Sequence, residues 1–149
     1  MTATNSEVIR VLNTLIETCK DGQNGYQTAA KCVTNMDLKA LFDSYAQQRR
    51  YYTVELQSEV QRLGGNPEKH GTFAGPVWRA WTNMKSLLSD GSEHAVIAEC
   101  ERGEDAAKER YEGALKAILP AHVHALIERQ LASIREAHDR VHALELATA

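Results

Sequence analysis

The feature that most constrains this chain is the spacing of its apolar residues, which recur at helical intervals through four long segments. Such spacing puts apolar side chains on one face of each helix, and a chain of 149 residues with only three prolines can stay helical throughout. The stripes predict helices over about residues 5–33, 37–63, 92–118 and 121–146. A chain of this length can bury one core without disulfides or metals, so we expect a single all-α domain over residues 1–149.

A long connection, residues 64–91, separates the second of these helices from the third. A helix of about 26 residues is about 39 Å long, and the connection can run back along that length. The second and third long helices are then parallel, whereas the short turns elsewhere predict two antiparallel hairpins. Two hairpins joined by one long crossover make the ferritin-like form of the four-helix bundle. Within the crossover, residues 75–88 have the pattern of a short amphipathic helix.

Three stretches of the sequence resemble a known bacterial family. They are "VLNTLIETCKDGQNGYQTAA" (11–30), "LKALFDSYAQQRRYYTVELQSEVQRLGG" (38–65) and "AECERGEDAAKERYEGAL" (98–115). That family consists of ferritin-like four-helix bundles of similar length and is catalogued as a domain of unknown function. The resemblance covers nearly the whole chain and implies the fold. It implies no reaction, although ferritin-like relatives suggest a stress-associated role.

A ferritin-like dimetal site requires a Glu from each of two helices and a Glu-x-x-His from each of the other two. No histidine of this chain has a Glu three residues before it. Helical counting nevertheless places Glu104 and His138 on inward faces and Glu55 at the edge of one. The sequence therefore disfavours a standard dimetal oxidase site, and it leaves Glu55, Glu104 and His138 as candidate ligands of an atypical iron or manganese site.

The favoured alternative is a buried polar network that needs no cofactor. An inward Glu must find a partner or become neutral, because burying a lone charge costs several kcal/mol. We place the apolar stripe of the second helix so that Gln48 and Tyr52 point inward, in the same layer as Glu104. Gln48, Tyr52, Arg135 or His138 would then satisfy Glu104.

The segment "IREAHDRVHALE" (134–145) raises a separate question, because His138 and His142 are neighbours on a helix face. On the predicted fourth helix, His138 faces the core, His142 lies on its flank, Glu136 points away, and Glu145 lies near the helix end. We therefore expect no site from this segment alone, and only His138 to take part in one.

The crossover carries both tryptophans of the chain, Trp78 and Trp81. Aromatic residues are enriched at the centres of interfaces, which makes both of them candidates for a contact between subunits or with a protein partner of the crossover helix. The alternative is that they cover the core of the bundle.

Cysteines and glycines within the helices have simpler explanations. We expect Cys19 and Cys100 to act as small buried apolar residues, with a redox role as the alternative. Gly22, Gly25 and Gly103 disfavour helix, so they indicate close helix packing or room for a ring such as that of a tyrosine.

Composition and charge argue against a nucleic-acid-binding or membrane-spanning protein. A net charge of −3 without a basic cluster argues against nucleic acid, and no apolar run could cross a membrane. The polar N-terminus and three cysteines without a CxxC motif favour a cytoplasmic protein. The sequence predicts a non-catalytic, self-associating ferritin-like bundle; the alternative is an atypical metal-binding oxidase or metal-storage protein.

Overall fold

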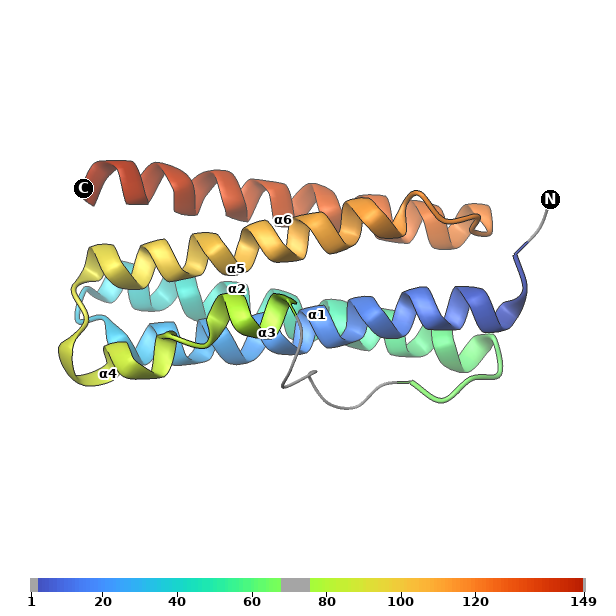
Figure 1. Cartoon of the computed structure of the whole chain (residues 1–149), viewed down its shortest axis with the longest axis horizontal. Coiled ribbons are helices and arrows are strands. Elements are labelled where there is room, and N and C mark those ends of the chain that lie inside the picture. Colours follow the sequence, from blue (N-terminus) through green and yellow to red (C-terminus); the bar gives the residue numbers. More distant parts are fainter. Residues whose placement is uncertain (1–2, 68–75, 149) are drawn as a thin grey trace.

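The computed structural model describes residues 3–67 and 76–148, and in these residues it is a bundle of helices without strands. The elements are α1 (Asn5–Cys32), α2 (Met36–Arg62), α3 (Pro76–Trp81), the 3-10 helix η1 (Met84–Ser86), α4 (Leu87–Asp90), α5 (Glu93–Ala114) and α6 (Ala121–Thr148). Helices α1 and α2 form one antiparallel hairpin and α5 and α6 the other (Figure 1). The short helices of the crossover lie along α1 and α5, which confirms the predicted ferritin-like four-helix bundle.

Side-chain caps fix where three of the long helices begin. The Oγ1 of Thr4 accepts a hydrogen bond from the backbone N–H of Glu7, and the Oγ of Ser92 accepts one from the N–H of Ala95. The Oδ1 of Asn35 accepts hydrogen bonds from two N–H groups at the start of α2, which therefore begins one residue earlier than predicted. These bonds satisfy donors that have no partner inside the helix.

Two predicted helices end or break early. Helix α5 stops at Ala114, whereas the prediction extended it to residue 118; Gly113 weakens its last turn and Pro120 disfavours helical backbone at the residue before it. The predicted crossover helix begins at residue 75, outside the described residues, and its remainder is divided among α3, η1 and α4. The hydroxyls of Thr82 and Ser86 donate to nearby backbone carbonyls there and compete with a continuous helix.

The inward face of α2 differs from the predicted one. Tyr52 points inward as predicted, but Gln48 does not; the buried residues are Leu38, Phe42, Ala46, Arg49, Tyr52, Thr53, Leu56 and Val60. Gln48 lies on the flank of this face, and Arg49 takes the inward position. The sequence analysis did not place Arg49 inward, and an arginine is seldom fully buried.

Trp81 fills a slot between two long helices. Its indole packs over Gly25 of α1 and Gly103 of α5, where a methyl group on either glycine would overlap the ring. The indole also meets the ring of Tyr26 edge-on, and Trp81 is only 5% exposed. The two glycines thus make room for a tryptophan rather than a tyrosine, and the predicted interface role of Trp81 is replaced by a core role.

Among the described residues, no helix has both the length and the apolar composition that a bilayer crossing requires.

Candidate functional site

The centre of the bundle holds a buried ion pair between α2 and α5. Arg49 places Nη1 at 2.5 Å from Oε1 of Glu104 and Nη2 at 2.6 Å from Oε2, so the guanidinium and the carboxylate bind through two parallel hydrogen bonds. The two side chains are 1% and 0% exposed. Glu104 is thus inward, as predicted, but its partner is Arg49 and not one of the four expected residues.

Several neighbouring residues accommodate and contact the guanidinium of Arg49. Gly22 leaves room for the guanidinium, since a Cβ there would lie 3.3 Å from Nη1. The Nε–H of Arg49 donates to Oε1 of Gln48 at 3.2 Å, and the guanidinium lies 5.5 Å from the ring centroid of Tyr26. Burial alone would lower the pKa of Arg49, but the charge and hydrogen bonds of Glu104 raise it above its usual value. Arg49 is therefore a permanent cation in the core.

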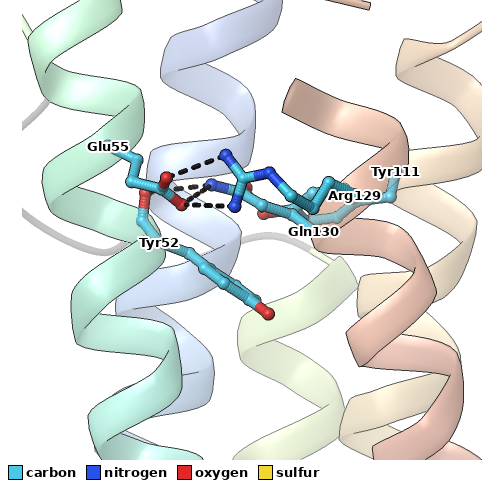
Figure 2. Close-up of polar contacts among 5 residues, drawn as sticks. All are labelled: Tyr52, Glu55, Tyr111, Arg129 and Gln130. Atoms are coloured by element: carbon cyan, nitrogen blue, oxygen red, sulfur yellow. Dashed lines mark hydrogen bonds and ion pairs between the residues drawn. The ribbon is translucent and has the colours of Figure 1, made fainter. Parts of the chain in front are cut away.

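A second polar network runs from the core to the surface between α2 and α6 (Figure 2). The hydroxyl of Tyr111 donates to Oε1 of Gln130 at 2.7 Å, and Nε2 of Gln130 donates to Oε1 of Glu55 at 3.1 Å. Arg129 reaches the same carboxylate from the solvent side, with Nη2 at 2.9 Å from Oε2. The Sγ of Cys19 lies 3.0 Å from the Tyr111 oxygen. Since the hydroxyl proton is already given to Gln130, the Cys19 thiol is the donor in that contact.

Both predicted core thiols are free and buried. Burial raises the pKa of Cys19 to about 11. Burial likewise raises the pKa of Cys100 well above its usual value. A thiol reacts as its thiolate, so these two groups are poor nucleophiles at neutral pH.

The three predicted metal ligands take part in three separate interactions. Glu104 binds Arg49, Glu55 binds Arg129 and Gln130, and His138 contacts residues of the α5–α6 surface. The carboxylates of Glu104 and Glu55 are already neutralised by arginines of the chain.

Of two other residues expected beside Glu104, one lies on the surface and one is buried. Arg135 is 52% exposed and pairs with Glu112 at 3.2 Å, so its predicted core role was wrong. It falls on the outer side of α6 because the neighbouring Ile134 takes the inward position. Tyr52 is buried, and its backbone carbonyl accepts a long hydrogen bond of 3.5 Å from Nε2 of Gln130.

The segment around His138 forms a cluster with α5 that sequence reasoning missed. The Nε2 of His138 lies 2.6 Å from Oδ1 of Asp105, and Nδ1 of His142 lies 2.6 Å from Oε1 of Glu101. The two imidazoles are stacked, with 6.2 Å between centroids and an interplanar angle of 2°. His138 therefore sits in the α5–α6 groove and not in the core. The missing signal was the i, i+4 pair of acids on α5, which matches the i, i+4 histidines of α6.

A hollow of about 310 Å³ opens between α1 and the crossover. It is lined on one side by α1, including Lys31, and on the other by Trp78, Trp81, Met84 and Lys85. Trp78 is half-buried at its rim, in contrast with the fully packed Trp81.

Comparisons with known proteins agree with the architecture. Residues 7–117 match a family described as Domain of unknown function (DUF2383). A Dps1 mutant from Mycobacterium smegmatis superimposes with a TM-score of 0.76 at 14% identity, over 95% of this chain and 97% of that chain. A two-domain protein from Anabaena variabilis with DJ-1/ThiJ/PfpI-like and ferritin-like domains gives a TM-score of 0.81 at 14% identity. That alignment covers 99% of this chain but 41% of the Anabaena protein. No curated protein matches the sequence.

Proposed function

This chain belongs to the DUF2383 family, and we propose that it is a non-catalytic ferritin-like bundle that binds protein partners, a second copy of itself among them. The observation that carries the proposal is the Arg49–Glu104 ion pair at the centre of the bundle. In a ferritin-like oxidase, metal ions neutralise the inward carboxylates. In this chain a guanidinium supplies the positive charge instead.

Displacing that guanidinium would be expensive. A metal ion that took Glu104 would leave Arg49 buried and without its counter-charge, and an unpaired charge in a protein interior costs several kcal/mol. The Arg129–Glu55 pair imposes a similar competition at the second predicted ligand, at lower cost because Arg129 is exposed. An oxidase or metal-storage role centred on these carboxylates is therefore disfavoured. A cytoplasmic location and a stress-associated role are part of the same proposal.

The hollow beside the crossover is the partner-binding surface in this proposal. Its lining includes the half-buried ring of Trp78 and two lysines, Lys31 and Lys85. A partner segment that inserts an apolar side chain and places acidic groups beside the lysines fits this surface. Trp81 must be left intact in any test, because it holds α1 and α5 together.

The central prediction of the proposal is tested by metal loading. Untagged protein, purified without chelator, is incubated with ferrous iron or with manganese, and bound metal and oxygen consumption are measured. We expect no metal that depends on Glu104 and no ferrous oxidation. Stoichiometric metal that is lost in Glu104→Gln but retained in Glu101→Gln would contradict the proposal, because it would locate the metal at the centre of the bundle.

Self-association is tested by sedimentation velocity on Trp78→Ala. We expect wild-type protein to self-associate and the variant to dissociate, with unchanged helix content by circular dichroism. Tyr51→Ala is the matched control, because Tyr51 is an aromatic residue of α2 that is 62% exposed and does not line the hollow. A monomeric wild type, or an equal effect of both variants, would count against this surface.

A further inference from the structure

We propose that the groove between α5 and α6 binds one divalent transition metal ion through Glu101, Asp105 and His138. One ligand atom from each of these residues lies within 4.8 Å of the other two. Two carboxylates come from successive turns of α5 and the imidazole from α6, so the ion would join the two helices of the second hairpin. This site lies outside the central ion pair and goes beyond the function proposed above.

The donor set suits a zinc-type ion. Imidazole nitrogen and carboxylate oxygen are ordinary ligands of Zn²⁺, which takes four ligands and accepts a water in an open position. Two carboxylates and a neutral imidazole carry a charge of about −2 before binding and about zero afterwards.

The orientation of His138 is already that of a metal ligand. Its Nε2 faces Asp105 across the groove, at 2.6 Å from Oδ1, while its Nδ1 lies 3.2 Å from Oδ1 of Asp139 on its own helix. Histidines that bind metal commonly donate the other ring N–H to a carboxylate, which fixes the ring and its tautomer. Asp139 supplies that outer partner, and the ion would replace the direct contact between Nε2 and Asp105.

Glu101 is positioned in the same way. Its side chain is 15% exposed, as is that of His138, so both lie within the groove and not on open surface. Oε1 of Glu101 lies 2.6 Å from Nδ1 of His142, and this contact orients the carboxylate. His142 is thus a positioning residue, and the cluster combines two ordered imidazoles with carboxylates of the opposite helix.

A neighbouring set offers the competing geometry. Glu101, His142 and Glu145 also bring one ligand atom each within 4.8 Å of the others. In that set the histidine, His142, is half exposed. Only one of its two carboxylates, that of Glu101, comes from α5. We therefore assign the ion to His138, and a test must distinguish the two histidines.

The experiment is calorimetric titration of the chelator-treated full chain with Zn²⁺, repeated with Co²⁺ while the visible absorption of cobalt is recorded. We expect one equivalent of metal. Loss of a ligand in His138→Ala or Glu101→Gln should weaken binding by more than about 100-fold, and loss of an outer partner in Asp139→Asn by about 10- to 100-fold. His124→Ala is the matched control, because His124 also pairs with a carboxylate, Glu128, but only within α6.

Three results would overturn the assignment. The first is the absence of saturable binding, which would leave the histidines as partners of the carboxylates only. The second is equal weakening in His124→Ala and His138→Ala. The third is binding that survives His138→Ala and is abolished by His142→Ala, which would place the ion in the competing set. Because Glu104 takes no part, metal lost in Glu101→Gln and kept in Glu104→Gln leaves the proposed function intact.

Discussion

The run "ERGED" (101–105) sends its carboxylates into two different regions of the molecule. Glu104 points into the centre of the bundle, where Arg49 binds it and excludes water. Glu101 and Asp105 point into the α5–α6 groove, where their partners are histidines. Both regions therefore take their acids from one short run of α5. They differ in the cation: the centre has a permanent one built into the chain, whereas the groove has imidazoles that must be protonated to act as cations.

Because of this difference, we assign a structural role to the central pair and a binding role to the groove. In our proposal, the guanidinium at the centre, which is always charged and makes two hydrogen bonds, keeps other cations from Glu104. A neutral imidazole can bind a metal ion, and in our proposal the groove exchanges a proton for one. A carboxylate on an inward helix face is therefore not sufficient evidence for a metal site, because its partner decides what it can bind.

The largest expected effect comes from breaking the central pair. Glu104→Ala leaves Arg49 buried without a partner and should lower the free energy of unfolding by about 3–5 kcal/mol. The double variant Arg49→Met/Glu104→Leu removes both charges and should recover most of that loss. Urea unfolding followed by circular dichroism measures both. A double variant as unstable as Glu104→Ala would mean that the pair contributes more than charge compensation.

A substitution at Gly103 tests the packing of the inner face of α5, whereas the variants above test its charge. Gly103→Ala pushes a methyl group into the indole of Trp81 and should cost about 1–3 kcal/mol of unfolding free energy. Gly113→Ala is the control on the outer face, since Gly113 is helical, exposed and has no atom within 4 Å of an added Cβ. That substitution should stabilise the protein by about 0.5–1 kcal/mol. Thermal unfolding of the two variants should therefore shift in opposite directions, and shifts of the same sign would contradict the packing of Trp81.

The smallest expected effect is in the groove of the metal-free protein. His138→Ala removes a contact with Asp105, whose side chain is 55% exposed, and should change the free energy of unfolding by about 1 kcal/mol or less. With excess Zn²⁺ the gap between wild type and variant should widen, because only the wild type gains stability from binding. Thermal unfolding with and without Zn²⁺ measures the gap. A gap that zinc does not change would contradict the difference drawn between the two regions.

Much of the fold was predictable because the signals are local. The stripes of α1, α5 and α6 and the capping residues Thr4 and Ser92 can be read directly from the chain. The long crossover then leaves one arrangement of the hairpins. The phase of α2 was not predictable in the same way. In "ALFDSYAQQRR" two overlapping apolar series compete, and only the position of Glu104 across the bundle makes an inward Arg49 favourable.

Predicting the sites from the sequence was harder than predicting the fold, because the sites depend more on long-range contacts. Glu104 could be placed inward from the stripe of α5, but its partner comes from a different hairpin. The cluster around His138 requires the register between α5 and α6, which a single sequence does not specify. The choice between a core role and an interface role for Trp81 was open for a related reason: the slot between Gly25 and Gly103 exists only when α1 and α5 are side by side.

The placement of both tryptophans in the crossover has an optical consequence. Trp81 is enclosed by α1 and α5 and Trp78 is partly solvated, and no tryptophan lies in the four long helices. Intrinsic fluorescence therefore reports on the packing of the crossover against α1 and α5. Far-ultraviolet circular dichroism reports mainly on the long helices. If the crossover detaches before the bundle melts, emission will shift to longer wavelength while the ellipticity is unchanged. The chain thus carries its own spectroscopic label at the segment that we propose as the contact with partners.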